Sequence, residues 1–113
     1  MPVKLPSDTV IAPEKLTRYL LVKRTFDGKS QFLRQAGYTL DNWEQLEQDL
    51  RQQVLPHDAT LIERTVYGNI FAIRVSLTGP NGKTLFVNTI WMNEFRSGVT
   101  KFITLYPDKG RLP

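Results

Sequence analysis

The stretch that decides the fold class is residues 71–92, which read FAIRVSLTGPNGKTLFVNTIWM. Apolar and polar residues alternate on both sides of residues 79–83, a pattern typical of two strands that each bury one face. Residues 79–83 combine glycine, proline and asparagine, so the stretch predicts a β-hairpin. Residues 60–66 and 99–106 predict one further strand on each side of this hairpin. Because the connections are short, the four strands are expected to form one antiparallel sheet.

The half of the chain before Pro56 has a helical period instead, with apolar residues three and four positions apart. Pro13 suits the first turn of one helix, and Gly37 is a favourable residue to close a second. The third helix begins at Thr39 or Asp41, either of which is a good N-cap residue, and ends before Pro56. The apolar residues that define the three helices are Leu16, Tyr19 and Leu20, then Phe32, Leu33 and Ala36, and then Leu40, Trp43, Leu46, Leu50 and Val54.

This order of elements predicts an α+β fold, with N-terminal helices packed on a four-stranded antiparallel sheet whose other face stays partly open. Residues 1–12 contain two prolines and no clear period, so they are expected to form an extended arm. Residues 13–113 are expected to form a single domain, because 113 residues suffice for one hydrophobic core.

Composition excludes several classes of function. The chain has no cysteine and a single histidine, His57, which rules out thiolate metal sites, cysteine nucleophiles and any mechanism that needs two imidazoles. Asp41, Glu44 and Glu47 share a helix face, but without histidine they indicate a solvated surface or an attachment site for a basic partner. We therefore predict no metal and no cofactor. The chain lacks a membrane-spanning run and a signal-peptide pattern, which favours a soluble cytoplasmic protein, with export by another route left open.

Charge is segregated along the chain, which carries 15 Lys and Arg against 11 Asp and Glu. Residues 15–34 are strongly basic, residues 35–58 are acidic, and residues 59–113 are basic again. Either these charges lie on ordinary solvated surfaces, or they attract a polyanion to one side of the molecule. Trp91, Phe95 and Tyr106 lie among the bases and either stack on nucleic-acid bases or belong to the core. The basic segment contains Lys15, Arg18, Lys23, Arg24, Lys29 and Arg34 against Asp27.

The last strand combines two hydroxyl groups. Strand alternation places Phe102, Thr104 and Tyr106 on one face and Lys101 on the other. A hydroxyl and a phenol two residues apart can hold a phosphate and transfer a proton, whereas the alternative is that the aromatic residues belong to the core. His57, between a proline and an aspartate, is either a general base or an ordinary loop histidine.

Several segments together resemble a known family. They are residues 13–21 (PEKLTRYLL), 29–33 (KSQFL), 36–38 (AGY), 42–46 (NWEQL), 77–82 (LTGPNG), 89–91 (TIW) and 101–107 (KFITLYP). The chain resembles an uncharacterised bacterial family, the domain of unknown function 6883, over nearly its whole length. Such domains occur as small stand-alone proteins and as C-terminal modules of large secreted adhesin-like toxins.

A looser resemblance concerns the fold. Helices before an antiparallel sheet that ends in Thr-x-Tyr-Pro look like the metal-independent ribonuclease toxins of the barnase, colicin and RelE-like superfamily. This resemblance implies that RNA lies across the sheet and that Thr104 and Tyr106 serve the chemistry. It also suggests Arg74 or Lys101 as phosphate ligands. Family members often carry a basic residue where this chain has Asn88. This departure implies that the chain lacks one cation that full activity would use.

The leading functional hypothesis is a toxin-like, metal-independent ribonuclease or RNA-binding domain, the toxin of a toxin–antitoxin pair. Tyr106 or His57 would move protons and Thr104 would hold a phosphoryl oxygen. Arg74 or Lys101 would supply the cation. Asn88 and Trp91 would add further RNA contacts. The alternative is a non-catalytic protein-interaction module or antitoxin, whose acidic helix around residues 43–50 and open sheet bind a protein partner.

Overall fold

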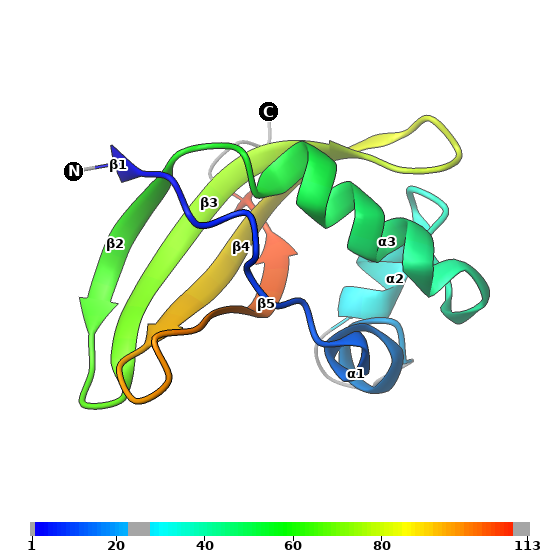
Figure 1. Cartoon of the computed structure of the whole chain (residues 1–113). Helices are drawn as coiled ribbons and strands as arrows, with labels where there is room; N and C mark the ends of the chain where they lie inside the picture. The colour runs from blue at the N-terminus through cyan, green and yellow to red at the C-terminus, as the bar shows by residue number, and fades with distance from the viewer. Residues whose placement is uncertain (1, 23–27, 110–113) are drawn as a thin grey trace.

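The computed structural model describes residues 2–22 and 28–109 and shows helices packed against an antiparallel sheet (Figure 1). The predicted α+β class is confirmed. Within the described residues the sheet has five strands in the order β1-β2-β3-β4-β5, so the predicted number of four is wrong. The added strand, β1, has two residues, too few to show a period, and it precedes the helices instead of following them. The strands are β1 (Pro2–Val3), β2 (Ala59–Arg64), β3 (Gly68–Thr78), β4 (Thr84–Glu94) and β5 (Thr100–Pro107).

Helices occur at the three predicted places. They are α1 (Pro13–Lys15) continued by the π-helical turn η1 (Leu16–Leu20), α2 (Lys29–Arg34), the short 3-10 turn η2 (Leu40–Asn42), α3 (Trp43–Asp49) and the π-helical turn η3 (Leu50–Val54). The backbone N–H of Thr39 donates to the side chain of Asn42 at 2.8 Å, so Thr39 marks the start of the third helical segment. Lys23, Arg24 and Asp27 of the predicted basic segment lie outside the described residues.

The segment between β1 and α1 crosses the whole sheet. At one edge β1 pairs with β2, and at the other edge Val10 forms a parallel bridge with Lys101 of β5. Figure 1 shows this segment passing in front of β3 and β4 before it reaches α1. It therefore covers the same face of the sheet on which the helices gather.

The β3–β4 turn confirms the predicted hairpin and holds the end of α2. The backbone N–H of Gly79 donates to the carbonyl of Lys83 at 3.0 Å, and Gly82 takes a left-handed φ of 87°. A Cβ atom at Gly79 would clash with the carbonyl oxygen of Ala36. Only glycine allows this close approach between the turn and the chain that follows α2.

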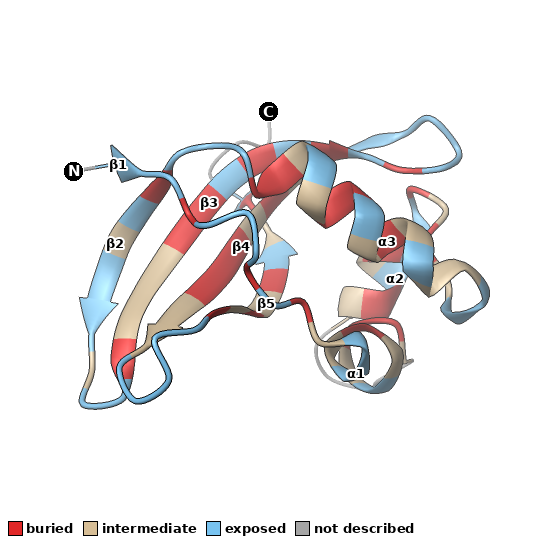
Figure 2. Ribbon diagram, viewed as in Figure 1, coloured by how far each residue is buried: buried red, intermediate tan, exposed pale blue. Residues whose placement is uncertain are grey.

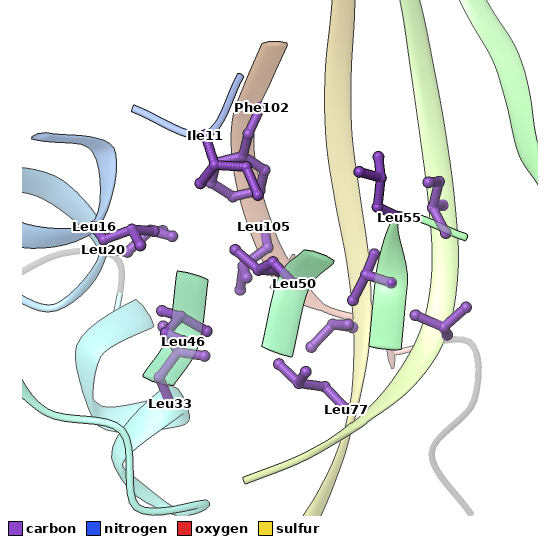
Figure 3. Close-up of a cluster of buried hydrophobic side chains, with 14 of the residues drawn as sticks. Ile11, Leu16, Leu20, Leu33, Leu46, Leu50, Leu55, Leu77, Phe102 and Leu105 are labelled. Atoms are coloured by element: carbon purple, nitrogen blue, oxygen red, sulfur yellow. The ribbon is translucent and has the colours of Figure 1, made fainter. Parts of the chain in front are cut away.

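The core lies between the helices and one face of the sheet. Of the apolar residues predicted to define the third helix, three are fully buried, one is partly buried and one is 46% exposed: Leu46, Leu50 and Val54, then Trp43, and then Leu40. Figure 3 shows Leu46 and Leu50 among leucines of η1, α2 and the strands. Trp91 is also fully buried, and its ring meets that of Phe102 edge to face, with the centroids 5.1 Å apart.

Among the described residues, the opposite face of the sheet is exposed at some positions, although Ala72 and Ile90 on this face are buried. Ile73, Val75 and Leu77 of β3 are buried, whereas the alternating Arg74 and Ser76 are exposed, as Figure 2 shows along this strand. No helix of the described residues is placed over these exposed positions, since the helical stripes pack on the buried side. We call this surface the outer face.

The predicted alternation in the last strand is wrong at one point. Ile90 pairs with Thr104 and Trp91 pairs with Phe102, so Ile103 is an extra residue in β5. This β-bulge turns Phe102 into the core, while Tyr106 stays 39% exposed on the outer face. A bulge shifts the period of alternation, and the residues around it do not reveal the shift.

A buried hydrogen bond links the segment between α2 and η2 to the end of α3. The Tyr38 hydroxyl donates to Asp49 Oδ2 at 2.6 Å, and both residues are buried. Burial, with the hydrogen bond and charge of Asp49, raises the pKa of Tyr38 above its ordinary value.

Replacing Tyr38 with phenylalanine is expected to lower the free energy of unfolding by about 1.5–3 kcal/mol, because the buried carboxylate of Asp49 loses a donor. In the wild type, the unfolded chain ionises at Tyr38 above pH ~10 while the folded chain does not, so stability should decline as the pH rises. Urea unfolding at neutral and alkaline pH measures both effects. Tyr67→Phe, at an exposed turn, is the control and should leave stability unchanged.

Candidate functional site

Three predicted site residues form one row across the outer face. Arg74 of β3 lies opposite Asn88 of β4, and Asn88 lies opposite Tyr106 of β5. Directly opposed residues of an antiparallel sheet point to the same side, so the three side chains are neighbours. They line a pocket of about 560 Å³ together with Pro107, Asp108 and Lys109. We call it the outer-face pocket.

Asp108 holds the guanidinium of Arg74 in a fixed position. Arg74 Nε and Nη2 donate to the two carboxylate oxygens of Asp108 at 2.9 and 2.7 Å. The side chain of Asp108 is 4% exposed and that of Arg74 is 53% exposed. The carboxylate is therefore buried, whereas the guanidinium is accessible to solvent. The hydrogen bond and charge of Asp108 raise the pKa of Arg74 above its ordinary value. The guanidinium has N–H donors beyond the two that Asp108 accepts, and these can bind an anion.

The phenol of Tyr106 is positioned by Asn88. Asn88 Nδ2 donates to the Tyr106 hydroxyl oxygen at 3.3 Å, which leaves the phenol O–H to donate to a ligand. Asn88 Oδ1 is buried and has no hydrogen-bond partner among the described residues. A buried acceptor without a partner is costly, so a donor group of a ligand would stabilise this position.

Two other predicted residues lie elsewhere. Lys101 donates to Glu94 at 2.8 Å near the β4–β5 turn, and this hydrogen bond, with one from Ser97, lowers the pKa of Glu94. Thr104 accepts a hydrogen bond from Lys29 of α2 at 2.9 Å, and it lines a separate pocket. The predicted phosphate and proton-transfer residues, His57 included, are therefore split between four places.

The remaining two predicted residues do not line the outer-face pocket. Trp91 is fully buried, and its Nε1–H donates to Thr89 Oγ1 at 2.8 Å, so its ring has no face free for stacking. His57 is exposed in the turn before β2, on the side of β3 away from β4 and β5.

Sequence reasoning missed Asp108 and Lys109. Asp108 directly follows the last strand, and its backbone N–H donates to the carbonyl of Phe86 at 2.9 Å, which continues the pairing with β4. The signal in the sequence is an acid immediately after Pro107, but its partner Arg74 lies 34 residues earlier and depends on the strand order.

Within residues 2–22 and 28–109, no group of three His, Cys, Asp or Glu side chains is arranged to hold a metal ion. No helix in the same part of the chain has the length and apolar character to cross a membrane.

The fold and site define an α+β domain whose antiparallel sheet exposes an arginine–asparagine–tyrosine row on one face. Residues 4–109 match the family described as Domain of unknown function (DUF6883), and the chain belongs to this family. The family resemblance predicted from the sequence is thus confirmed. The chain matches no curated protein and no solved structure.

Proposed function

We propose that this domain binds single-stranded RNA on its outer face and cleaves it without a metal ion, as the toxin of a toxin–antitoxin pair. One observation carries the proposal: the Arg74–Asn88–Tyr106 row borders a pocket on a sheet face that no helix of the described residues covers. The row supplies a rigid cation, an amide and a phenol. These groups suit a phosphodiester, which carries one negative charge and several acceptor oxygens.

The proposed chemistry is attack of a ribose 2′-hydroxyl on the adjacent phosphorus. Arg74 stabilises the charge that develops on the phosphoryl oxygens. The carboxylate of Asp108, which lines the pocket, accepts the proton of the 2′-hydroxyl, and the O–H of Tyr106 donates a proton to the leaving 5′-oxygen. The products are a 2′,3′-cyclic phosphate and a free 5′-hydroxyl.

The direct test is incubation of the purified protein with end-labelled RNA in the presence of a chelator. We expect fragments that end in a 2′,3′-cyclic phosphate, and no cleavage of the 2′-deoxy strand of the same sequence, which lacks the nucleophile. RNA that stays intact at a large excess of protein would refute cleavage. Fluorescence anisotropy of the 2′-deoxy strand measures binding separately.

Asp108→Asn separates binding from cleavage. Loss of a negative charge beside Arg74 is expected to tighten RNA binding about threefold at low salt, a gain that salt screens. Cleavage should fall at least about a hundredfold, because the proton acceptor is lost. Anisotropy and the cleavage assay measure the two effects, with Asp41→Asn on η2 as the control. Weaker RNA binding by Asp108→Asn would contradict the assignment.

A second candidate function, a protein-interaction module, is favoured by a different surface. Val66, Tyr67 and Phe95 are strongly exposed and border a pocket of about 490 Å³ where the β2–β3 and β4–β5 turns meet. Exposed apolar clusters of this kind often contact another protein. Induced expression in bacteria discriminates the two functions, because a ribonuclease toxin arrests growth and an interaction module does not.

A further inference from the structure

The pocket where the β2–β3 and β4–β5 turns meet has walls that the backbone holds in place. The N–H of Phe95 donates to the carbonyl of Tyr67 at 3.0 Å, so the two turns are linked directly. Thr65 Oγ1 accepts from the N–H groups of Tyr67 and Gly68, both at 3.1 Å, which fixes the first turn. Figure 1 shows both turns at one end of the sheet, away from α2. A ligand would therefore meet a preformed site, which we call the turn pocket.

The walls of the turn pocket are mostly apolar. Its lining residues are Val66, Tyr67, Glu94, Phe95 and Arg96. The three apolar or aromatic residues among them are each more than half exposed, and apolar surface gathered at one place is typical of a binding site. The volume of about 490 Å³ is within the range of ~300–1,000 Å³ that ligand sites occupy. An occupant with an apolar or aromatic group would cover these walls.

The charges at the turn pocket favour an anionic occupant. The carboxylate of Glu94 accepts from Lys101 Nζ and from Ser97 Oγ, both at 2.8 Å, so an ammonium offsets its charge. Arg96 is exposed and forms no hydrogen bond or ion pair with any of the described residues. Its guanidinium can therefore donate two parallel hydrogen bonds to a carboxylate. One guanidinium matches the single charge of a carboxylate, whereas a phosphate monoester carries about −1.5 to −2 and needs more donors.

We propose that the turn pocket binds the C-terminal end of a peptide chain whose last residue is aromatic. A chain end supplies both groups, because the terminal carboxylate and the last side chain are attached to one carbon atom. The carboxylate pairs with Arg96, and the side chain packs against Tyr67, Phe95 and Val66. This inference rests on the second candidate function, since it names the chemistry of the protein partner. The two can fail separately, because growth after induction tests the function and peptide binding tests the chemistry.

The test is calorimetric titration of the whole protein with two forms of one peptide, acetyl-glycyl-glycyl-phenylalanine. One form has a free C-terminal carboxylate and the other has a C-terminal amide. We expect the carboxylate form to bind at least about tenfold more tightly, because the amide offers no charge to Arg96. In Arg96→Met the two forms should bind equally. Arg34→Met, which removes the same charge from the exposed end of α2, is the matched control and should keep the wild-type difference.

Tyr67→Ala tests the apolar wall. It should weaken binding of both forms about fivefold and leave the difference between them unchanged, because the ring supplies contact area and no charge. Equal binding of the two forms by the wild type would overturn the inference, and so would failure of the wild type to bind the carboxylate form. A preference for the carboxylate that persists in Arg96→Met would refute the assignment of Arg96. Loss of binding in Arg74→Met with retention in Arg96→Met would place the peptide in the outer-face pocket instead.

Discussion

Trp91→Ala is expected to lower the free energy of unfolding by about 3–5 kcal/mol, the largest effect on stability that we predict. Trp91 is 0% exposed in β4, so its removal leaves a cavity between the helices and the sheet. It also removes the edge-to-face contact with Phe102 and the donor to Thr89 Oγ1. Because small domains have a total stability of ~5–15 kcal/mol, the variant should be close to unfolding. Urea unfolding followed by circular dichroism measures the loss.

The second tryptophan provides a matched control. Trp43 packs against the core from α3 but is only partly buried, so Trp43→Ala should cost about 1–2 kcal/mol. Trp91→Phe keeps most of the ring volume and loses the indole N–H. Its loss in the free energy of unfolding should therefore lie between those of the two alanine variants. A loss in Trp43→Ala equal to that in Trp91→Ala would contradict this account of the core.

Most of the fold follows from apolar periodicity in the sequence. Leu46, Leu50 and Val54 recur at helical spacing because they share one buried face, and Ile73 and Val75 alternate because the sheet buries one side. Two features of the structure that the sequence analysis did not predict, strand β1 and the bulge in β5, have no such periodic signal. Strand β1 is too short to show a period, and the bulge at Ile103 is a local change of register that depends on the packing of β4 against β5.

The candidate site was predictable in part, because the hairpin turn fixes the register between β3 and β4. The compact hairpin turn at residues 79–83 pairs Thr78 with Thr84, which by simple counting pairs Arg74 with Asn88. Tyr106 joins this row only through the register of β5, which the bulge shifts. Asp108 could not be assigned to Arg74 without that register, and the burial of Trp91 depends on which face of β4 receives the helices.

Tyr106→Phe is expected to reduce RNA cleavage at least about a hundredfold, since the variant keeps the ring and loses the proton that the leaving 5′-oxygen needs. Arg74 and Asp108 keep their ion pair in this variant, so the affinity for the 2′-deoxy strand should change by less than about threefold. A cleavage assay and anisotropy on the same preparation give both values. The loss should lie in the rate of the chemical step and not in binding.

Tyr67→Phe is the matched control, because it deletes the same atom from a phenol that is 73% exposed in the β2–β3 turn. It should cleave RNA at the wild-type rate. Equal rates for Tyr106→Phe and the wild type would remove Tyr106 from the chemistry, even if the protein cleaves RNA. An RNA in which sulfur replaces the leaving 5′-oxygen should be cleaved by Tyr106→Phe at nearly the wild-type rate, because a thiolate departs without protonation. That rescue would separate a proton donor from a residue that only shapes the pocket.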